Sequence, residues 1–112
     1  MAKVKPISER EFMRQVIQLA HMHGWRHFHN LYSIGSDRGW PDLVLVHPKR
    51  GVIYAELKSE IGVLRLEQQQ WLLDLDQAGQ KVFVWRPGQL DEINRILACV
   101  VTIEAVSDIS TP

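Results

Sequence analysis

The stretch GWPDLVLVHPKRGVIYAELKSE, residues 39–60, carries the strongest structural signal in this chain. It holds two apolar runs, PDLVLVH and VIYAELK, which are joined by the turn-forming sequence PKRG. Such a pattern predicts a β-hairpin, and Pro41 is tolerated because it opens the first strand. Charged residues stand at the ends of the runs: Asp42 follows Pro41 at the start of the first, and Glu56 and Lys58 stand at the end of the second.

Antiparallel pairing predicts that these three charged groups meet. Asp42 is about as far from the turn as Glu56 and Lys58 are, so the groups come out side by side at one end of the sheet. The alternation of side chains along a strand puts Glu56 and Lys58 on one face and Leu57 on the other. An ordinary solvated salt bridge across two strands is the simpler interpretation, and it stays open at this point.

The chemistry of such a cluster favours a metal site. Two carboxylates that converge repel each other unless a cation lies between them, and hard oxygen ligands suit Mg²⁺ or Mn²⁺. A neighbouring lysine can orient water, help to deprotonate it, or offset charge on a phosphate. Together these groups indicate metal-assisted hydrolysis of a phosphodiester.

The segments around the hairpin predict a mixed α/β fold. Ser8, followed three residues later by Glu11, is typical of a helix start, and Gly24 ends the helical pattern. A short strand is expected in WRHFHNLY, a helix from Leu66 to Ala78, a strand in KVFVWR and a last helix in PGQLDEINRILA. The order helix, three strands, helix, strand, helix predicts a mixed central sheet flanked by helices.

Length and composition predict one domain over residues 1–112, with a core at about 8–97 and a tail at 98–112. The tail sequence CVVTIEAV is compatible with an extra strand, and SDISTP is typical of a disordered end. Thirteen basic and thirteen acidic residues give no net charge. Any binding of nucleic acid must therefore rely on a local patch, on metal ions or on a dimer.

The sequence predicts neither secretion nor membrane insertion. The start MAKVKPISER lacks an apolar signal region, and no apolar run approaches the roughly 20 residues that a membrane span needs. The single cysteine, Cys99, excludes an internal disulfide and has no metal-site spacing. A cytoplasmic location without a membrane partner is therefore expected.

The chain resembles the VRR-NUC nuclease domain of the PD-(D/E)xK superfamily in the stretches GWPDLVLV, AELK and GVLRLEQQQWLLDLDQAGQKVFVWRP. The resemblance covers residues from about Ser8 to Leu97, and the chain is similar to the stand-alone domains found in bacteriophages. It implies a restriction-endonuclease-like core of the order α-β-β-β-α-β, which agrees with the order expected above. It also implies a metal-dependent nuclease.

The resemblance implies roles for individual residues. Asp42 and Glu56 would be the two acids and would bind the metal. The backbone carbonyl of Leu57 would be the third ligand that the protein supplies. Lys58 would be the catalytic lysine. The second helix of the family carries a glutamine three residues before a tryptophan, which implies that Gln68 steers the scissile phosphate or the lysine.

Some of these assignments have an alternative. Gln69 is the second choice for the helical glutamine. The first helix of such nucleases often supplies a further acid, and Glu9 is preferred to Glu11 because it stands three residues before the core-facing Phe12. Acids in a first turn are also favoured simply by the helix dipole. Trp40 replaces a smaller residue of the family, and packing is preferred to stacking on an unpaired base.

Five histidines suggest a zinc site as a further alternative. His21 and His23 lie roughly 200° apart on a helix, and their spacing fits no standard zinc pattern. His27 and His29 can share one face of a strand, where they are expected to lie near the DNA path or to cap the core. A zinc site is therefore disfavoured.

The expected function is that of a Mg²⁺- or Mn²⁺-dependent DNA endonuclease. Arg38 and Arg65 are expected beside the site, where they would bind phosphates of the substrate. Short stand-alone members of the family look like Holliday-junction resolvases, which cut four-way junctions with two symmetric sites, and this implies a homodimer. The alternatives are a nicking or flap nuclease, and a non-catalytic nucleic-acid-binding or assembly module. For a phage-encoded chain the expected location is the host cytoplasm.

Overall fold

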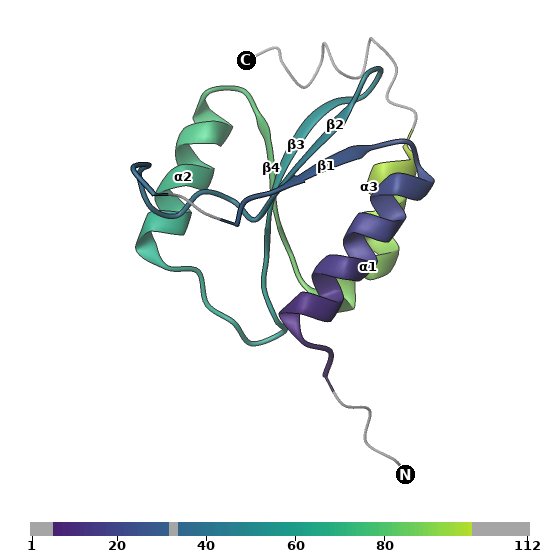
Figure 1. Cartoon of the computed structure of the whole chain (residues 1–112), viewed down its shortest axis with the longest axis horizontal. Coiled ribbons are helices and arrows are strands. Elements are labelled where there is room, and N and C mark those ends of the chain that lie inside the picture. Colours follow the sequence, from purple (N-terminus) through teal and green to yellow (C-terminus); the bar gives the residue numbers. More distant parts are fainter. Residues whose placement is uncertain (1–5, 32–33, 100–112) are drawn as a thin grey trace.

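The computed structural model describes residues 6–31 and 34–99. The elements follow the predicted order and form a mixed α/β fold, as expected (Figure 1). They are α1 (Glu9–Met22), β1 (Arg26–His29), β2 (Leu43–His47), β3 (Gly51–Leu57), α2 (Leu66–Gln77), β4 (Lys81–Trp85), the 3₁₀ turn η1 (Pro87–Gln89) and α3 (Leu90–Ala98). The extra strand considered in CVVTIEAV lies, after Cys99, outside the described residues. No helix in the described part of the chain is long and apolar enough to cross a membrane.

The four strands form one sheet in the order β1-β2-β3-β4. The first three are antiparallel neighbours, and the β2–β3 hairpin pairs Leu43 with Ala55 and His47 with Gly51. β4 runs parallel to β3, and α2 provides the crossover that a parallel connection requires. β1 is shorter than the predicted strand, because its pairing ends with His29 opposite Leu43, the residue at which β2 begins.

α1 and α3 cover one face of the sheet (Figure 1). The buried side chains of α1 lie four residues apart, at Phe12, Val16 and Ala20, so they form one stripe along the helix. They and the buried residues of α3 pack against alternate strand residues, which are Leu43, Leu45, Ile53, Ala55, Leu57 and Trp85. Burial of apolar surface stabilises by roughly 25 cal/mol per Å². This face therefore fixes which strand residues must point the opposite way.

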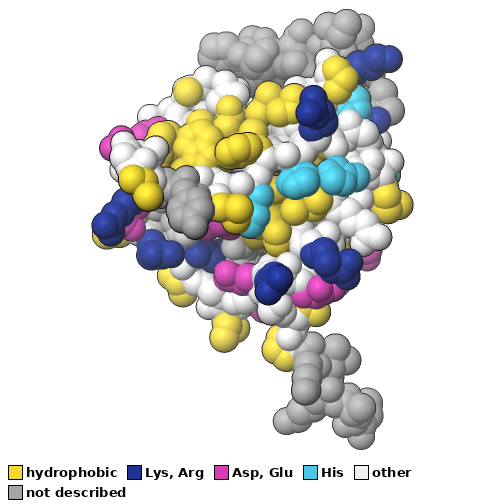
Figure 2. Space-filling model, viewed as in Figure 1, with side chains coloured by type: hydrophobic (Ala, Val, Ile, Leu, Met, Phe, Trp, Pro, Cys, Tyr) yellow, Lys and Arg dark blue, Asp and Glu magenta, His cyan; other side chains and the backbone are white. Residues whose placement is uncertain are grey.

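α2 covers only part of the opposite face. The ring of Trp40 lies edge-on to the rings of Tyr54 and Trp71, with centroids 5.7 Å and 4.8 Å away. Trp40 therefore packs between the sheet and α2, as preferred from the sequence. Of the residues that share this face with Tyr54, Phe28 is largely exposed and Val46 is partly exposed. Hydrophobic side chains also gather on the surface seen in Figure 2, beside a short run of histidines.

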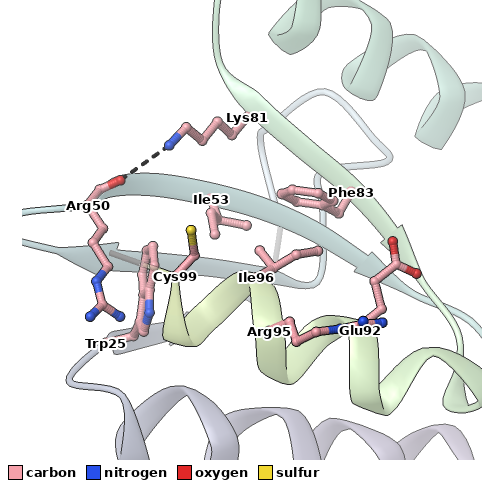
Figure 3. A pocket seen from close by; sticks show the side chains of 9 residues that line it. All are labelled: Trp25, Arg50, Ile53, Lys81, Phe83, Glu92, Arg95, Ile96 and Cys99. Carbon is pink, nitrogen blue, oxygen red and sulfur yellow. Dashed lines mark hydrogen bonds between the residues drawn. The ribbon is translucent and has the colours of Figure 1, made fainter. Parts of the chain in front are cut away.

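A cavity of about 340 Å³ opens on the α3 side of the sheet. Trp25, Ile53, Phe83 and Ile96 give it an apolar lining, and charged side chains including Lys81 stand around it (Figure 3). Ile53 and Lys81 pair with each other near the turn end of the hairpin. The cavity thus lies away from the end of the sheet at which the charged residues of the hairpin are found.

Gly39 determines how the loop before β2 meets α2. Its φ of +100° suits glycine, and a Cβ at this position would overlap the backbone of Glu67 in the first turn of α2. Gly35, in the same loop, has a similar φ of +81°, but a Cβ there would meet no atom within 4 Å. The close approach of loop and helix therefore requires glycine at position 39.

We predict that Gly39→Ala lowers the free energy of unfolding by about 3 kcal/mol or more, whereas Gly35→Ala lowers it by about 1–2 kcal/mol. Both variants place alanine at a positive φ, but only Gly39→Ala also pushes the loop away from α2. Urea unfolding followed by circular dichroism measures both losses. Equal losses would contradict a close contact between Gly39 and α2.

Candidate active site

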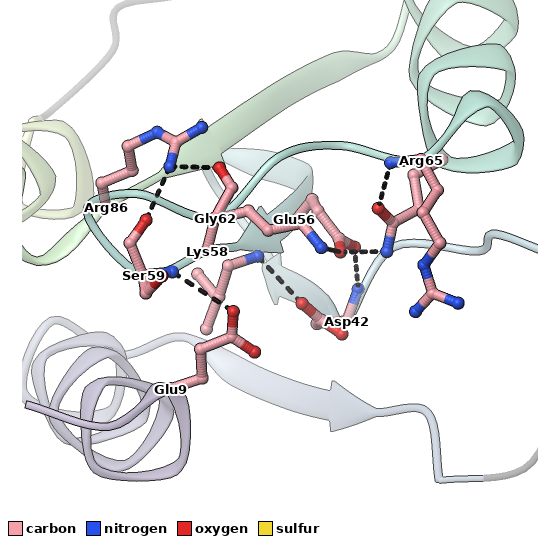
Figure 4. A network of polar contacts seen from close by, with 10 residues as sticks. Glu9, Asp42, Glu56, Lys58, Ser59, Gly62, Arg65 and Arg86 are labelled. Atoms are coloured by element: carbon pink, nitrogen blue, oxygen red, sulfur yellow. Dashed lines mark hydrogen bonds and ion pairs between the residues drawn. The ribbon is translucent and has the colours of Figure 1, made fainter.

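Asp42 and Glu56 lie side by side at the open end of the β2–β3 hairpin (Figure 4). Asp42 directly precedes β2 and stands opposite Glu56, one residue beyond the pair formed by Leu43 and Ala55. The backbone N–H of Asp42 donates to Glu56 Oε1 at 3.2 Å, and the backbone N–H of Leu57 donates to Asp42 Oδ2 at 2.9 Å. Each carboxylate is thus held by the backbone of the opposite chain segment, and the two acids converge as their distance from the turn predicts.

Glu56 is buried where the two acids meet, and Asp42 is half-buried. Glu56 is only 2% exposed, because it points from β3 toward α2. Burial, followed by the nearby charge of Asp42, raises the pKa of Glu56 from 4.5 to about 7. Burial also raises the pKa of Asp42, although the Leu57 N–H and the charge of Lys58 act in the opposite direction. The two carboxylates therefore resist being charged together, which is the situation that a bound cation relieves.

Lys58 lies at the same end of β3 and on the same side as Glu56. Its Nζ is 3.6 Å from Glu56 Oε2, and the residue is 8% exposed. Leu57, which stands between them in the sequence, is buried in the core on the opposite face. The alternation expected from the sequence is thus present, and one positive charge stands beside the carboxylate pair.

Gln68 joins the first turn of α2 to this cluster. Its Nε2 donates to Glu56 Oε2 at 2.8 Å, and its Oε1 accepts from the backbone N–H of Arg65 at 2.9 Å. Gln68 is 9% exposed, whereas Gln69 faces solvent. The structure places the first-choice glutamine at the site and its alternative outside, because successive helical residues point about 100° apart.

Of the two candidate acids in α1, Glu9 is the one near the site. Its Oε1 accepts from the backbone N–H of Ser59 at 3.2 Å, in the loop that follows β3. Glu11 instead pairs with Arg14 on the surface at 2.6 Å, and its backbone N–H donates to Ser8 Oγ, as the predicted helix cap requires. Glu9 therefore contacts the loop of the site, and no hydrogen bond within the described residues joins it to either hairpin acid.

Arg38 and Arg65 border a polar hollow of about 330 Å³ next to the carboxylates. Asn30, Asp42 and Gln68 also line this hollow. Both arginines are exposed, so their guanidinium groups are accessible to an anion. The structure thus brings together the two arginines expected beside the site. Asn30, directly after β1, also lines this hollow, although no pattern in the sequence selects it.

Of the histidines, only some lie together, and none contacts the hairpin acids within the described residues. His21 Nε2 lies 2.9 Å from His27 Nδ1, and His23 Nε2 lies 2.7 Å from Asn94 Oδ1. Desolvation, followed by the charges of His21 and His29, lowers the pKa of His27. Over residues 6–31 and 34–99, no group of three or more His, Cys, Asp or Glu side chains is arranged to hold a metal ion.

Arg86 belongs to this neighbourhood, although the sequence analysis did not select it. It follows β4 and reaches the loop after Lys58, where it donates to two backbone carbonyls (Figure 4). An arginine at the end of a strand has no distinctive spacing from the acids. No pattern in the sequence could therefore have indicated this contact.

We predict that the metal-free protein becomes less stable as the pH rises from about 5 to about 8. The pKa of Glu56 is about 7 in the folded chain against an ordinary 4.5, so its protonated form stabilises the fold below pH 4.5. This contribution is lost as the pH rises through 7 and amounts to at most about 3 kcal/mol. Urea unfolding in EDTA at both pH values measures the change.

Glu56→Gln is the control for this pH dependence, because its side chain is neutral at every pH. The variant should show a much smaller change in the free energy of unfolding than the wild-type chain. If the free energy of unfolding changed equally with pH in both proteins, the pKa of Glu56 would not be raised in the folded chain.

Comparison with known proteins identifies the family. The model of the VRR-NUC domain family matches residues 6–87, which hold the hairpin and both of its acids. A solved chain described as "VRR_NUC domain" is 24% identical, with a TM-score of 0.65, over 76% of this chain and 91% of that chain. A second, a "VRR_NUC domain protein", is 14% identical, with a TM-score of 0.64, over 87% and 90%.

These two structural likenesses, at low sequence identity, show a shared fold. No curated protein matches the chain. The match to the family model spans most of the sequence and includes the stretches on which the resemblance was based. The chain therefore belongs to the VRR-NUC domain family, whose members have a nuclease-type fold.

Proposed function

We propose that this domain is a Mg²⁺- or Mn²⁺-dependent DNA endonuclease that hydrolyses phosphodiester bonds. The observation that carries the proposal is the meeting of the half-buried Asp42 with the buried side chains of Glu56 and Lys58. A purely structural hairpin has no need of an acid whose pKa is raised by burial and by a neighbouring carboxylate, because burying such an acid without a cation costs stability. We assign Asp42 to the PD motif, and Glu56 and Lys58 to the ExK motif, of the PD-(D/E)xK superfamily.

The available ligands fit a hard divalent cation. Asp42 and Glu56 offer carboxylate oxygens, and Leu57 offers its backbone carbonyl. Mg²⁺ is commonly held by one or two carboxylates, with water and substrate phosphates in the remaining positions. A structural zinc site would require four protein ligands, usually Cys or His, and the described residues form no such group. When bound, a divalent ion acidifies water and neutralises phosphate oxygens.

The neighbouring side chains would support this chemistry in different ways. Lys58, with its Nζ 3.6 Å from Glu56 Oε2, can hold a proton beside the attacking water or offset charge that develops on the phosphate. Gln68 keeps Glu56 oriented by donating to the same oxygen. Glu9 acts through the backbone of Ser59, next to Lys58, rather than by direct contact with the acids.

We propose further that the substrate is branched DNA, with the four-way junction as its preferred form. This part rests on the resemblance to stand-alone phage-type members. Two incisions need two sites, which a homodimer provides. Because the net charge is zero, affinity for DNA must come from local contacts, and Arg38 and Arg65 at the hollow are the residues we assign to phosphates.

The proposal is tested by cleavage of a labelled synthetic four-way junction beside a linear duplex. We expect paired symmetric cuts with Mg²⁺ or Mn²⁺ and none with EDTA. Asp42→Asn and Lys58→Met should each slow cleavage by roughly 100-fold or more, because each removes a group that stabilises the reacting charges.

The other outcomes of this assay are also informative. Equal cutting of both substrates would retain the nuclease and reject the junction preference. Binding of the junction by the wild-type chain without any cutting would reject the nuclease and favour a binding module of the same fold.

The adjacent glutamines of α2 offer a matched pair for the same assay. Gln68→Ala should slow cleavage by roughly 10- to 100-fold, because Glu56 Oε2 loses the amide that orients it. Gln69→Ala should cut at nearly the wild-type rate, since this side chain faces solvent. Similar losses in the two variants would point to an effect on α2 as a whole.

A further inference from the structure

The loop from Lys58 to Arg65 contains neither a helix nor a strand. It links β3 to α2, and its apolar side chains Ile61 and Val63 are exposed rather than packed in the core. Loops of this kind open easily unless other parts of the chain hold them. The position of Lys58 therefore depends on what anchors this loop.

Arg86, directly after β4, is an anchor of the loop. Its Nη1 donates to the Ser59 carbonyl at 2.6 Å and to the Gly62 carbonyl at 2.7 Å (Figure 4). The Gly62 N–H donates to the same Ser59 carbonyl at 3.3 Å, so the guanidinium closes a tight turn. The residue before it, Trp85, accepts from the Lys58 N–H at 3.0 Å. Arg86 forms no salt bridge with any residue in the described ranges. Its guanidinium instead makes charge-assisted hydrogen bonds to the two carbonyls.

The turn closed by Arg86 lies against the side chain of Lys58. A Cβ at Gly62 would stand 3.4 Å from Lys58 Cδ and 3.1 Å from Ser59 Oγ, which shows how closely this backbone approaches the lysine. Ser59 is held from two sides, because its N–H donates to Glu9 and its carbonyl accepts from Arg86. The loop thus forms one wall along the aliphatic part of Lys58.

We propose that Arg86 is a positioning residue, which holds the loop closed so that the Lys58 ammonium stays beside Glu56. The proposal rests on the nuclease function proposed above. Without the guanidinium, the turn against Lys58 is free to move, and the ammonium leaves its position 3.6 Å from Glu56 Oε2. A displacement of about 1 Å near a reacting centre can lower a rate by roughly 100-fold.

Substitutions of two arginines test this role in the full chain. Arg86→Met removes the donors, whereas Arg86→Lys keeps the positive charge and one donor nitrogen. Arg50→Met is the matched control: Arg50 Nη1 also donates to a backbone carbonyl, that of Leu97 at 2.5 Å, but at the turn end of the hairpin. One readout is kcat and KM for junction cleavage. The other is the rate of Lys58 acetylation by acetic anhydride, followed by mass spectrometry.

We expect Arg86→Met to lower kcat by roughly tenfold or more and to leave KM within about threefold. Acetylation of Lys58 should become about fivefold faster or more, because the loop no longer covers the side chain. Arg86→Lys should restore part of both properties. Arg50→Met should change neither, even where it lowers the melting temperature as much as Arg86→Met does.

The proposal is overturned if Arg86→Met behaves like Arg50→Met in both readouts. It is also overturned if KM rises while kcat and acetylation stay unchanged, because this would indicate a contact with DNA. If the wild-type chain cuts no DNA, the proposed function fails, and acetylation alone decides whether Arg86 positions Lys58. If Arg86→Met does not fold, Arg86→Lys compared with Arg50→Lys decides by the same two readouts.

Discussion

The register of the β2–β3 hairpin is the constraint on which the site depends. Pairing of Leu43 with Ala55 puts Asp42 opposite Glu56, and burial of Leu57 under the helices turns Glu56 toward α2. A slip by one residue would exchange the two faces of the strand and carry Glu56 into the apolar core. Burial of the apolar side chains therefore fixes the register of the hairpin, and this register keeps the two acids side by side.

Holding two acids in a buried place works against the stability of the fold. Burial and the charge of Asp42 raise the pKa of Glu56, while the charge of Lys58 and the hydrogen bond from the backbone N–H of Asp42 offset part of this effect. A local cost of this kind is typical of functional sites and is compensated elsewhere in the structure. In the proposed nuclease, a divalent cation would remove much of it.

Much of the fold and the centre of the candidate site could be predicted because the signals are local. Turn chemistry and alternation predict the hairpin and bring Asp42, Glu56 and Lys58 to one end. Helical periodicity relative to Phe12 selects Glu9 over Glu11, and the structure places Glu9 beside the loop of the site. The resemblance of the sequence to the VRR-NUC family points to Gln68, which helical periodicity alone would not mark as a site residue.

The order of the elements, the hairpin and the meeting of its charged ends thus follow from local patterns along the chain. Two contacts do not: Gln68 bridges Glu56 and the start of α2, and Arg86 holds Ser59 and Gly62. The physical reason is that these contacts join elements distant along the chain. They depend on how α2 and β4 pack against β3, and this packing arises from the whole core rather than from any local pattern.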